Sequence, residues 1–466
     1  MIKSISLIFL ITFSSSLSFS KTITLEEVVR SSMRHYPQVL EAVYSLEESE
    51  NRFRLARGEA FDARIKGEAD KRFEGFYDGE SIKAQIEKPI SYLNSKIYAG
   101  YRASDGEYPS YEGKRETIPE GEGYLGVSLS LLRNTLIDLR RYKVQIARED
   151  FKQSNFDLDR VKIKIQTAAV KAYWTWVVKA LELQAFNEIL ELAKTRQGNI
   201  SRRVKMGDLA EIYEAENDLY INERIANVKK AQIDYEVASF YLSLFYRNSN
   251  AEPIAIIRAW VPDVQMKDLE RVTYNRALLE RARNQNLKLK IINSKQKQAR
   301  AEMRLGNNYL LPKLDLNLEI GQDQNGSSAN SNIQETRAFL NFEIPLEFNR
   351  GIGKKRAGRF KYEAFRTEEK LENEKIKVML QVLLSKINNT QEVIDLTNTQ
   401  VTLSKKLAEA ELRKFTQGSS DLILLNIREE KLAQSKVKNL EALLKYHNQR
   451  AELKEVLVDF IVPNAE

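Results

Sequence analysis

The chain of 466 residues contains no cysteine and only two histidines, His35 and His447. Without cysteine it can form no disulfide, no thiolate metal site and no lipid-modified amino-terminal cysteine. A metal centre would have to be built from carboxylates, because the two histidines lie far apart in the sequence. The composition therefore predicts no metal site and no cofactor.

Long hydrophobic runs are also missing after the first residues. Residues 1–20, MIKSISLIFLITFSSSLSFS, combine a basic Lys3, a short apolar core and small residues before Lys21, the pattern of a cleaved secretory signal. The core has about half the length that a membrane anchor needs, so we expect cleavage and a mature chain starting at Lys21. No later segment approaches about 18 apolar residues in a row. The exported chain is therefore expected to be soluble outside the inner membrane or to cross a membrane as a β-barrel.

A strong charge of one sign is absent as well. The net charge is +8, and it falls by one when Lys3 leaves with the signal. Basic and acidic residues are interleaved along the chain, whereas nucleic-acid binding requires clustered basic residues. We therefore expect no nucleic-acid partner.

Proline is excluded from two long stretches of the chain. None of the nine prolines lies between Pro119 and Pro253 or between Pro345 and Pro463, as uninterrupted helices require. Both stretches are rich in Lys, Glu, Ala, Leu and Gln, and their apolar residues recur at spacings of three and four. This pattern predicts long helices with coiled-coil-like faces.

Each of these stretches is broken at a glycine. Gly207 lies in RRVKMGDLAEIYEAENDLY, and Gly418 lies in RKFTQGSSDLILLNIREEKL. Glycine can adopt the left-handed conformation that reverses a chain, and Ser419, Ser420 and Asp421 can cap the returning helix. Each stretch is therefore predicted to be a long helical hairpin with its tip at the glycine, and the paired tips indicate an internal repeat.

Strict alternation of apolar and polar residues precedes each hairpin. In the second half it covers about 311–348, and in the first half it covers 61–69 and 124–131. A period of two predicts strands with one apolar and one polar face, which match transmembrane barrel strands. Because so few strands cannot enclose an aqueous lumen, several chains must contribute to one barrel.

The first half carries an additional hairpin at about 78–119. Two alternating runs, 82–87 and 96–101, lie within it and are followed by a charged loop containing tyrosine and proline. This hairpin could widen the barrel, decorate its outer loop or fold beside the helices, and the sequence leaves the three placements open.

These patterns predict an α+β membrane protein made of two repeats. The first repeat covers 21–250 and the second covers 267–466, with 251–266 as the linker. Each repeat is expected to run from amphipathic helix to strands to helical hairpin.

The order of these parts resembles the TolC-like outer membrane efflux family over nearly all of the mature chain. The motifs that carry the resemblance are TITLEEVVRSSMRHYPQVLEA with Pro37, RAEMRLGNNYLLPKLDLNLEIG with Pro312, LNFEIPLEF before a glycine-containing elbow, and the tips at Gly207 and Gly418. Their order and their twofold repetition are more specific than any single motif.

The resemblance implies a homotrimer in which each chain supplies four strands to a shared twelve-stranded outer-membrane barrel. Twelve helices would form a tunnel, so that a large part of the protein lies in the periplasm. The tips would dock with a periplasmic adaptor (membrane fusion) protein and with an inner-membrane transporter of the RND or ABC class. The chain would then be a passive exit duct for small molecules or proteins, and not an enzyme.

The second tip departs from the family pattern. Family members often carry acidic residues six and nine positions after the tip glycine, and here these positions are Leu424 and Ile427. The resemblance therefore implies an entrance that is gated differently in this chain.

Six tip residues are expected to line or brace the entrance. They are Gly207, Asp208, Gly418, Asp421, Asn426 and Arg428. For the two aspartates, ordinary helix capping is an equal alternative. For Asn426 and Arg428, which follow the first turn, a pore or inter-chain contact is favoured.

Enzyme motifs are not found in the sequence. The segment FNRGIGKKRAGRF fits neither a P-loop nor a dinucleotide fingerprint, and it is expected to be a strand-to-helix elbow with basic residues near lipid headgroups. The open alternative to a duct is a periplasmic coiled-coil structural or tethering protein with a small β domain. The uninterrupted alternation over 338–348 argues against it.

Overall fold

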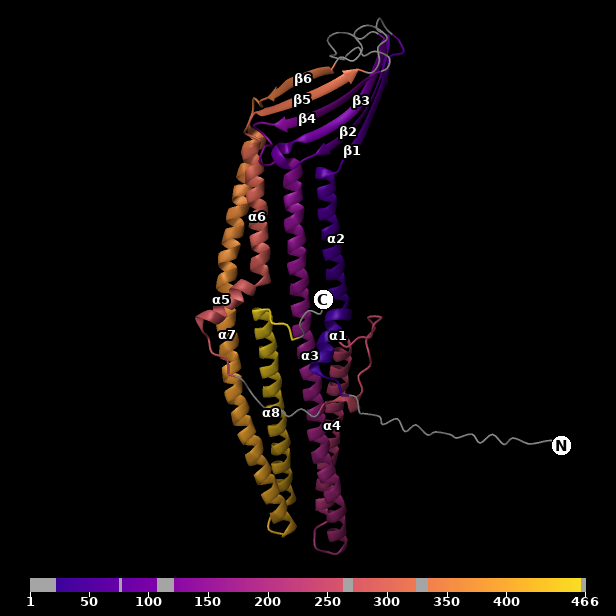
Figure 1. Ribbon diagram of the computed structural model, residues 1–466. Coiled ribbons are helices and arrows are strands. Elements are labelled where there is room, and N and C mark those ends of the chain that lie inside the picture. The colour runs from indigo at the N-terminus through magenta and orange to yellow at the C-terminus, as the bar shows by residue number, and fades with distance from the viewer. Residues whose placement is uncertain (1–21, 75–77, 107–120, 263–270, 324–333, 462–466) are drawn as a thin grey trace, which may run out of the picture. The chain divides into compact units, whose positions relative to one another are not determined.

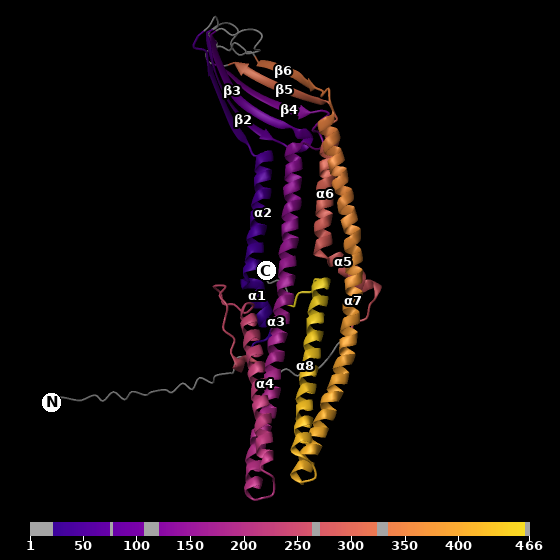
Figure 2. The ribbon, with the colours of Figure 1, turned by 180° about the vertical axis from the view of Figure 1, so that it is seen from behind.

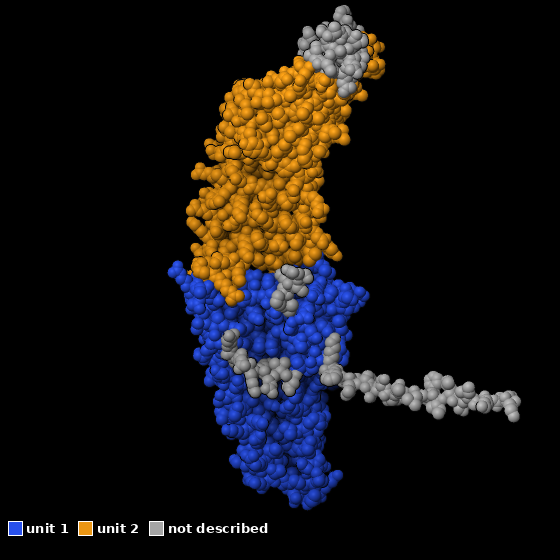
Figure 3. All heavy atoms as spheres, viewed as in Figure 1, with its two compact units in different colours: residues 1–40, 162–279, 378–466 blue, residues 41–161, 280–377 orange. Residues whose placement is uncertain are grey.

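The computed structural model describes residues 22–74, 78–106, 121–262, 271–323 and 334–461. The expected signal at 1–20 and the end of the expected linker at 263–266 lie outside the described residues. The chain forms two compact units, shown in Figure 3. Unit 1 comprises Met1–Leu40, Lys162–Leu279 and Val378–Glu466, and unit 2 comprises Glu41–Val161 and Glu280–Lys377. Each unit therefore takes segments from both expected repeats.

Unit 2 contains an antiparallel sheet whose six strands follow one another in chain order (Figure 1). The strands are β1 Arg64–Lys71, β2 Gly79–Pro89, β3 Lys96–Gly106, β4 Glu122–Ser130, β5 Lys313–Asp323 and β6 Gln334–Glu343. Every region expected to form strands thus contributes to one sheet, although β1 begins at Arg64 and β6 ends at Glu343, so that 61–63 and 344–348 are not strand.

The additional hairpin is part of this sheet. Its strands β2 and β3 pair with each other, β2 pairs with β1, and β3 pairs with β4. A short 3-10 helix, η1 Tyr92–Asn94, connects them, and the view from behind in Figure 2 shows the two strands within the sheet. The loop at 107–120 lies outside the described residues.

Four helices of unit 2 adjoin the sheet in sequence. They are most of α2 Pro37–Phe61, the first part of α3 Leu139–Lys205, α6 Leu287–Asn308 and the first part of α7 Asn349–Thr416. Leu305 and Tyr309 are buried against Ile137, so that the end of α6 is packed beside the start of α3. The short helix α5 Arg276–Gln285 precedes α6.

Unit 1 contains two helical hairpins. The second part of α3 turns into α4 Ile212–Ser243, and the second part of α7 turns into α8 Leu422–Leu457. Its core surrounds Trp176, which is fully buried on α3, and includes α1 Leu25–His35. Thr24 begins α1 because its hydroxyl accepts from the Glu27 amide while the Glu27 carboxylate accepts from the Thr24 amide.

None of the helices among the described residues carries an apolar stretch long enough to cross a bilayer.

Candidate functional site

Both helical tips have the same backbone geometry. Gly207 and Gly418 have φ angles of +81° and +76°. At each tip the glycine amide donates to the carbonyl three residues earlier, and the next amide donates to the carbonyl five residues earlier. This is the Schellman arrangement, which favours glycine because an L side chain would be strained at such a φ. The sequence places glycine at both positions for this reason.

A buried polar cluster lies on the helices just behind these tips, and we call it the tip network. It consists of Arg196 on α3, Arg224 on α4, and Asn426 and Glu429 on α8. Both arginines donate to the Asn426 Oδ1 at 2.9 Å, and both pair with the Glu429 carboxylate, Arg224 at 2.9 Å. All four residues are at most 6% exposed. The network therefore joins the two hairpins of one chain.

The charges of the tip network are not balanced. Two guanidinium groups share the single carboxylate of Glu429, and burial lowers the pKa of Arg224 although that carboxylate opposes the shift. Arg224 also donates to the Ile189 carbonyl at 2.8 Å, which ties α4 to α3. Removing one partner of a buried ion pair leaves an uncompensated charge, so the network holds the hairpins together only while it is complete.

An apolar cluster accompanies the tip network. Ile200 of α3, Phe415 of α7 and Leu422 and Leu425 of α8 are buried together. The same two hairpins thus meet through both polar and apolar contacts.

The six expected entrance residues occupy different environments. Asp421 caps α8 by accepting from the Leu424 amide at 2.7 Å, and Asp208 is exposed beside Gly207. Asn426 is only 1% exposed because it belongs to the tip network. The Nε of the partly buried Arg428 has no hydrogen-bond partner within the described part of the chain. The lining of an entrance by these residues stays a prediction.

Leu424 and Ile427, where the family pattern favours acidic residues, are exposed on α8. Their exposed fractions are 36% and 53%. The two positions thus carry apolar side chains on the surface of α8, while the charged groups of the tip network are buried behind them.

The sheet of unit 2 has two chemically distinct faces. In the register of the strands, one row runs through Ile65, Ile86, Ala99, Leu125 and Ile320. Side chains of this row are exposed; the exposed fractions of Ile65 and Leu125 are 80% and 56%. This apolar face matches a lipid environment more closely than water.

The opposite face carries ionised groups that are buried among their neighbours. Arg102 on β3 pairs with Glu122 on β4 at 2.6 Å and with Glu319 on β5 at 3.0 Å. The Tyr98 hydroxyl donates to Glu319 at 3.2 Å, and the Tyr124 hydroxyl donates to Gln85 at 3.0 Å. The polar face therefore joins several strands side by side.

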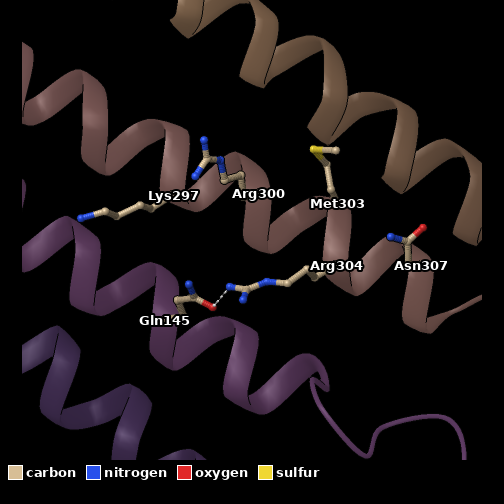
Figure 4. A pocket seen from close by; sticks show the side chains of 6 residues that line it. All are labelled: Gln145, Lys297, Arg300, Met303, Arg304 and Asn307. Carbon is tan, nitrogen blue, oxygen red and sulfur yellow. Dashed lines mark hydrogen bonds between the residues drawn. The ribbon is translucent and has the colours of Figure 1, made fainter.

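A cleft of about 460 Å³ lies between α3 and α6 in unit 2 (Figure 4). It is lined by Gln145, Lys297, Arg300, Met303, Arg304 and Asn307. Arg304 extends from α6 and donates to the Gln145 side chain of α3 at 3.0 Å, whereas Arg300 donates to the Tyr362 hydroxyl of α7 at 2.7 Å. The three cations make the cleft electropositive, but they are exposed and do not converge on one point.

No cluster of His, Cys, Asp or Glu suited to a metal ion occurs within the described ranges.

Comparisons with known proteins identify the fold. No protein-family model and no curated protein matches the sequence. Among solved structures, the Campylobacter jejuni CmeC outer membrane channel superposes with a TM-score of 0.63 at 13% identity, covering 94% of this chain and 86% of that one. The open state of the Neisseria gonorrhoeae MtrE outer membrane channel gives 0.64 at 13% identity, covering 93% and 88%.

The Vibrio cholerae outer membrane protein VceC gives a TM-score of 0.63 at 12% identity, covering 93% of this chain and 95% of that one. The chain has the fold of the TolC-like outer membrane efflux channels. The expected resemblance is thereby confirmed at the level of the TolC-like fold.

Arg196 and Arg224 are the members of the tip network that sequence reasoning missed in this chain. A signal for both was present. Arg196 lies between Ala193 and Ile200 on one buried stripe of α3, and Arg224 lies seven residues before the buried Ala231. A charged residue at a core position of a coiled-coil-like helix indicates a buried partner.

Proposed function

We propose that this protein is the outer-membrane exit duct of a tripartite efflux or type I secretion system. In this proposal it assembles as a homotrimer that forms a barrel in the outer membrane and a large periplasmic tunnel. It receives small molecules or proteins from a periplasmic adaptor and an inner-membrane transporter of the RND or ABC class. The duct itself is a passive channel, and the transporter supplies the energy.

The observation that carries this proposal is the two-faced sheet. Its apolar face is exposed, while its polar face contains the buried ion pairs of Arg102 with Glu122 and Glu319. A sheet in water would normally expose its polar face and bury its apolar face. A sheet with lipid on one side and an aqueous lumen on the other has the observed arrangement.

The tips are the proposed entrance. Opening requires the hairpins to separate, which exchanges one set of tip contacts for another. Gly207 and Gly418 reverse the chain there, Asp208 and Asp421 lie beside them, and Asn426 and Arg428 follow on α8. We assign to this group the closure of the resting duct.

The test is single-channel conductance of the purified mature protein in a planar lipid bilayer, with chemical crosslinking of the same sample. We expect discrete conductance steps from a preparation that crosslinks as a trimer. A protein that is extracted without detergent and does not conduct would contradict the duct and would support the coiled-coil tethering protein instead.

A further inference from the structure

We propose that the β2–β3 hairpin is part of the lipid-facing wall, so that each chain contributes six strands to the membrane-spanning sheet. The partner of the apolar face of this hairpin is the acyl-chain region of a bilayer. This inference rests on the proposed function and specifies the size of the duct. It differs from the four strands per chain that the family resemblance implies.

The apolar face of the sheet continues through the hairpin without interruption. Ile82 and Ile86 on β2 are 59% and 54% exposed, and Ile97 and Tyr101 on β3 are 45% and 40% exposed. The register sets Ile86 beside Ile65 of β1, and Ile97 beside Val127 of β4. A hairpin that lay in water outside the membrane would gain nothing from continuing the exposed apolar face.

Charged residues mark where the apolar face of the hairpin ends. On β2, the outward positions between Glu80 and Lys88 are Ile82, Ala84 and Ile86. Glu80 pairs with Lys71 at 2.8 Å, and Asp105 lies beside Glu80 in the register. From Glu80 to Lys88 a strand spans roughly 26 Å along its axis, which is about 20 Å across a bilayer at the usual tilt. This covers most of the apolar band of about 25 Å in outer-membrane barrels.

The polar face of the hairpin is continuous with the polar face of the other strands of the sheet. Arg102 of β3 forms ion pairs with both β4 and β5, and its partners Glu122 and Glu319 are 3% and 7% exposed. Gln85 of β2 accepts from the Tyr124 hydroxyl of β4. Between the charged residues that end the apolar face, the ionised groups of the hairpin thus lie on the opposite side of the sheet, as a wall between lipid and lumen requires.

The turn that connects β2 to β3 is hydrogen-bonded to β4 and to α3. Asn94 donates to Ser130 at the end of β4 at 3.2 Å and accepts from Arg140 at the start of α3. Arg141 donates to the Ser91 carbonyl at 3.0 Å. The hairpin is therefore held in the plane of the sheet at this end as well as through its strand pairing.

The consequence concerns the width of the duct. Three copies of a six-stranded sheet make eighteen strands, and barrels of about 16–18 strands leave an open aqueous channel. Barrel diameter grows roughly in proportion to strand number. The barrel of this protein is therefore wider than one of twelve strands, and larger solutes can pass its outer end.

The absence of cysteine permits a direct test by single-cysteine spin labelling in proteoliposomes. Ala84→Cys and Ala99→Cys place labels on the apolar face of the hairpin, and Ala338→Cys places one on the apolar face of β6. Ser81→Cys and Ser128→Cys are matched controls on the polar face. Collisions of each label with oxygen, which concentrates among acyl chains, are compared with collisions with a water-soluble nickel chelate.

We expect labels at 84, 99 and 338 to favour oxygen and labels at 81 and 128 to favour the chelate. If 338 favours oxygen while 84 and 99 do not, the hairpin lies outside the acyl region, and this inference falls while the duct stands. If 338 also fails to favour oxygen, the sheet does not face lipid and the proposed function itself is overturned. A strand count by electron cryomicroscopy of the crosslinked assembly decides the number independently, because twelve strands would contradict the proposal.

Discussion

Glu429 is the residue on which the charge balance of the tip network depends. Its carboxylate is the common partner of Arg196 and Arg224, and all three are buried. We expect Glu429→Gln to lower the free energy of unfolding by about 3 kcal/mol, because two buried guanidinium groups lose their counter-charge. Thermal or denaturant unfolding followed by helical circular dichroism measures this change.

The control for this variant lies one residue further along α8. Glu430 is exposed, so Glu430→Gln should change the free energy by less than about 0.5 kcal/mol. Equal losses from the two variants would show that the buried pairs have no special importance for stability.

His447 gives unit 1 a dependence on pH. Its ring stacks on Trp174 with centroids 3.6 Å apart, and burial, assisted by the charge of Arg450, lowers the pKa of His447 to about 4. The unfolded chain, with a histidine pKa near 6.5, then binds more protons between these values, so stability falls as the pH drops from about 6.5 towards 4. The loss is on the order of 2–3 kcal/mol at the lower end.

The variant His447→Phe keeps a ring on Trp174 but cannot take up a proton. We expect its unfolding midpoint to depend less on pH between about 4 and 6.5 than that of the unaltered protein. Parallel curves for the two proteins across this window would contradict the assignment to His447.

At the scale of elements, the tip turns depend on glycine for backbone conformation and not for space. An added Cβ at Gly207 or Gly418 would meet no heavy atom within 4 Å, yet both residues have positive φ. Alanine at either position should therefore cost about 1–2 kcal/mol. Gly198→Ala, in the helical part of α3 with equal space, should be neutral or stabilising by up to about 1 kcal/mol. Unfolding midpoints of the three variants measure the difference, and a neutral Gly418→Ala would show that the turn does not require the left-handed residue.

The sheet offers a second matched pair of glycines on β4. A Cβ at Gly126 would lie 2.3 Å from the Tyr98 ring, whereas a Cβ at Gly123 would meet nothing within 4 Å. We expect Gly126→Ala to lower the free energy of unfolding by about 1–3 kcal/mol by displacing Tyr98, and Gly123→Ala to have little effect. Thermal unfolding midpoints of the two variants measure the difference, and equal midpoints would contradict the close packing of Tyr98 over β4.

At the scale of the whole molecule, opening of the duct should depend on the tip network. A weaker network lets the two hairpins of one chain separate more readily, so Glu429→Gln should raise the fraction of time for which single channels conduct. Glu430→Gln should leave this fraction unchanged. If Glu429→Gln lowers stability without changing conductance, the network braces the hairpins but does not control the entrance.

The parts of this fold that were predictable are those encoded by short repeats in the sequence. Alternation with a period of two predicted the strands, and the lone glycine at 418 within a proline-free stretch predicted a chain reversal. The neighbours of the β2–β3 hairpin were not predictable, because alternation defines the faces of a strand but not the strand beside it. The tip network was missed because Arg196 and Asn426 are 230 residues apart in the chain. A local pattern can indicate that Arg196 has a buried partner, but it cannot identify that partner as Asn426.

The edge strands have a consequence for how the protein is made. In a solitary chain, β1 and β6 are edge strands, whose outer backbone N–H and C=O groups can pair with an extended segment of another chain. The exposed apolar side chains beside them favour association in water. Under the proposed assembly, a newly exported copy is most prone to aggregation before it meets other copies of the chain. The yield of assembled protein then depends on whether newly made copies meet one another faster than they aggregate. A cell that produces this protein is expected to shield the nascent sheet with a chaperone in the compartment that it crosses.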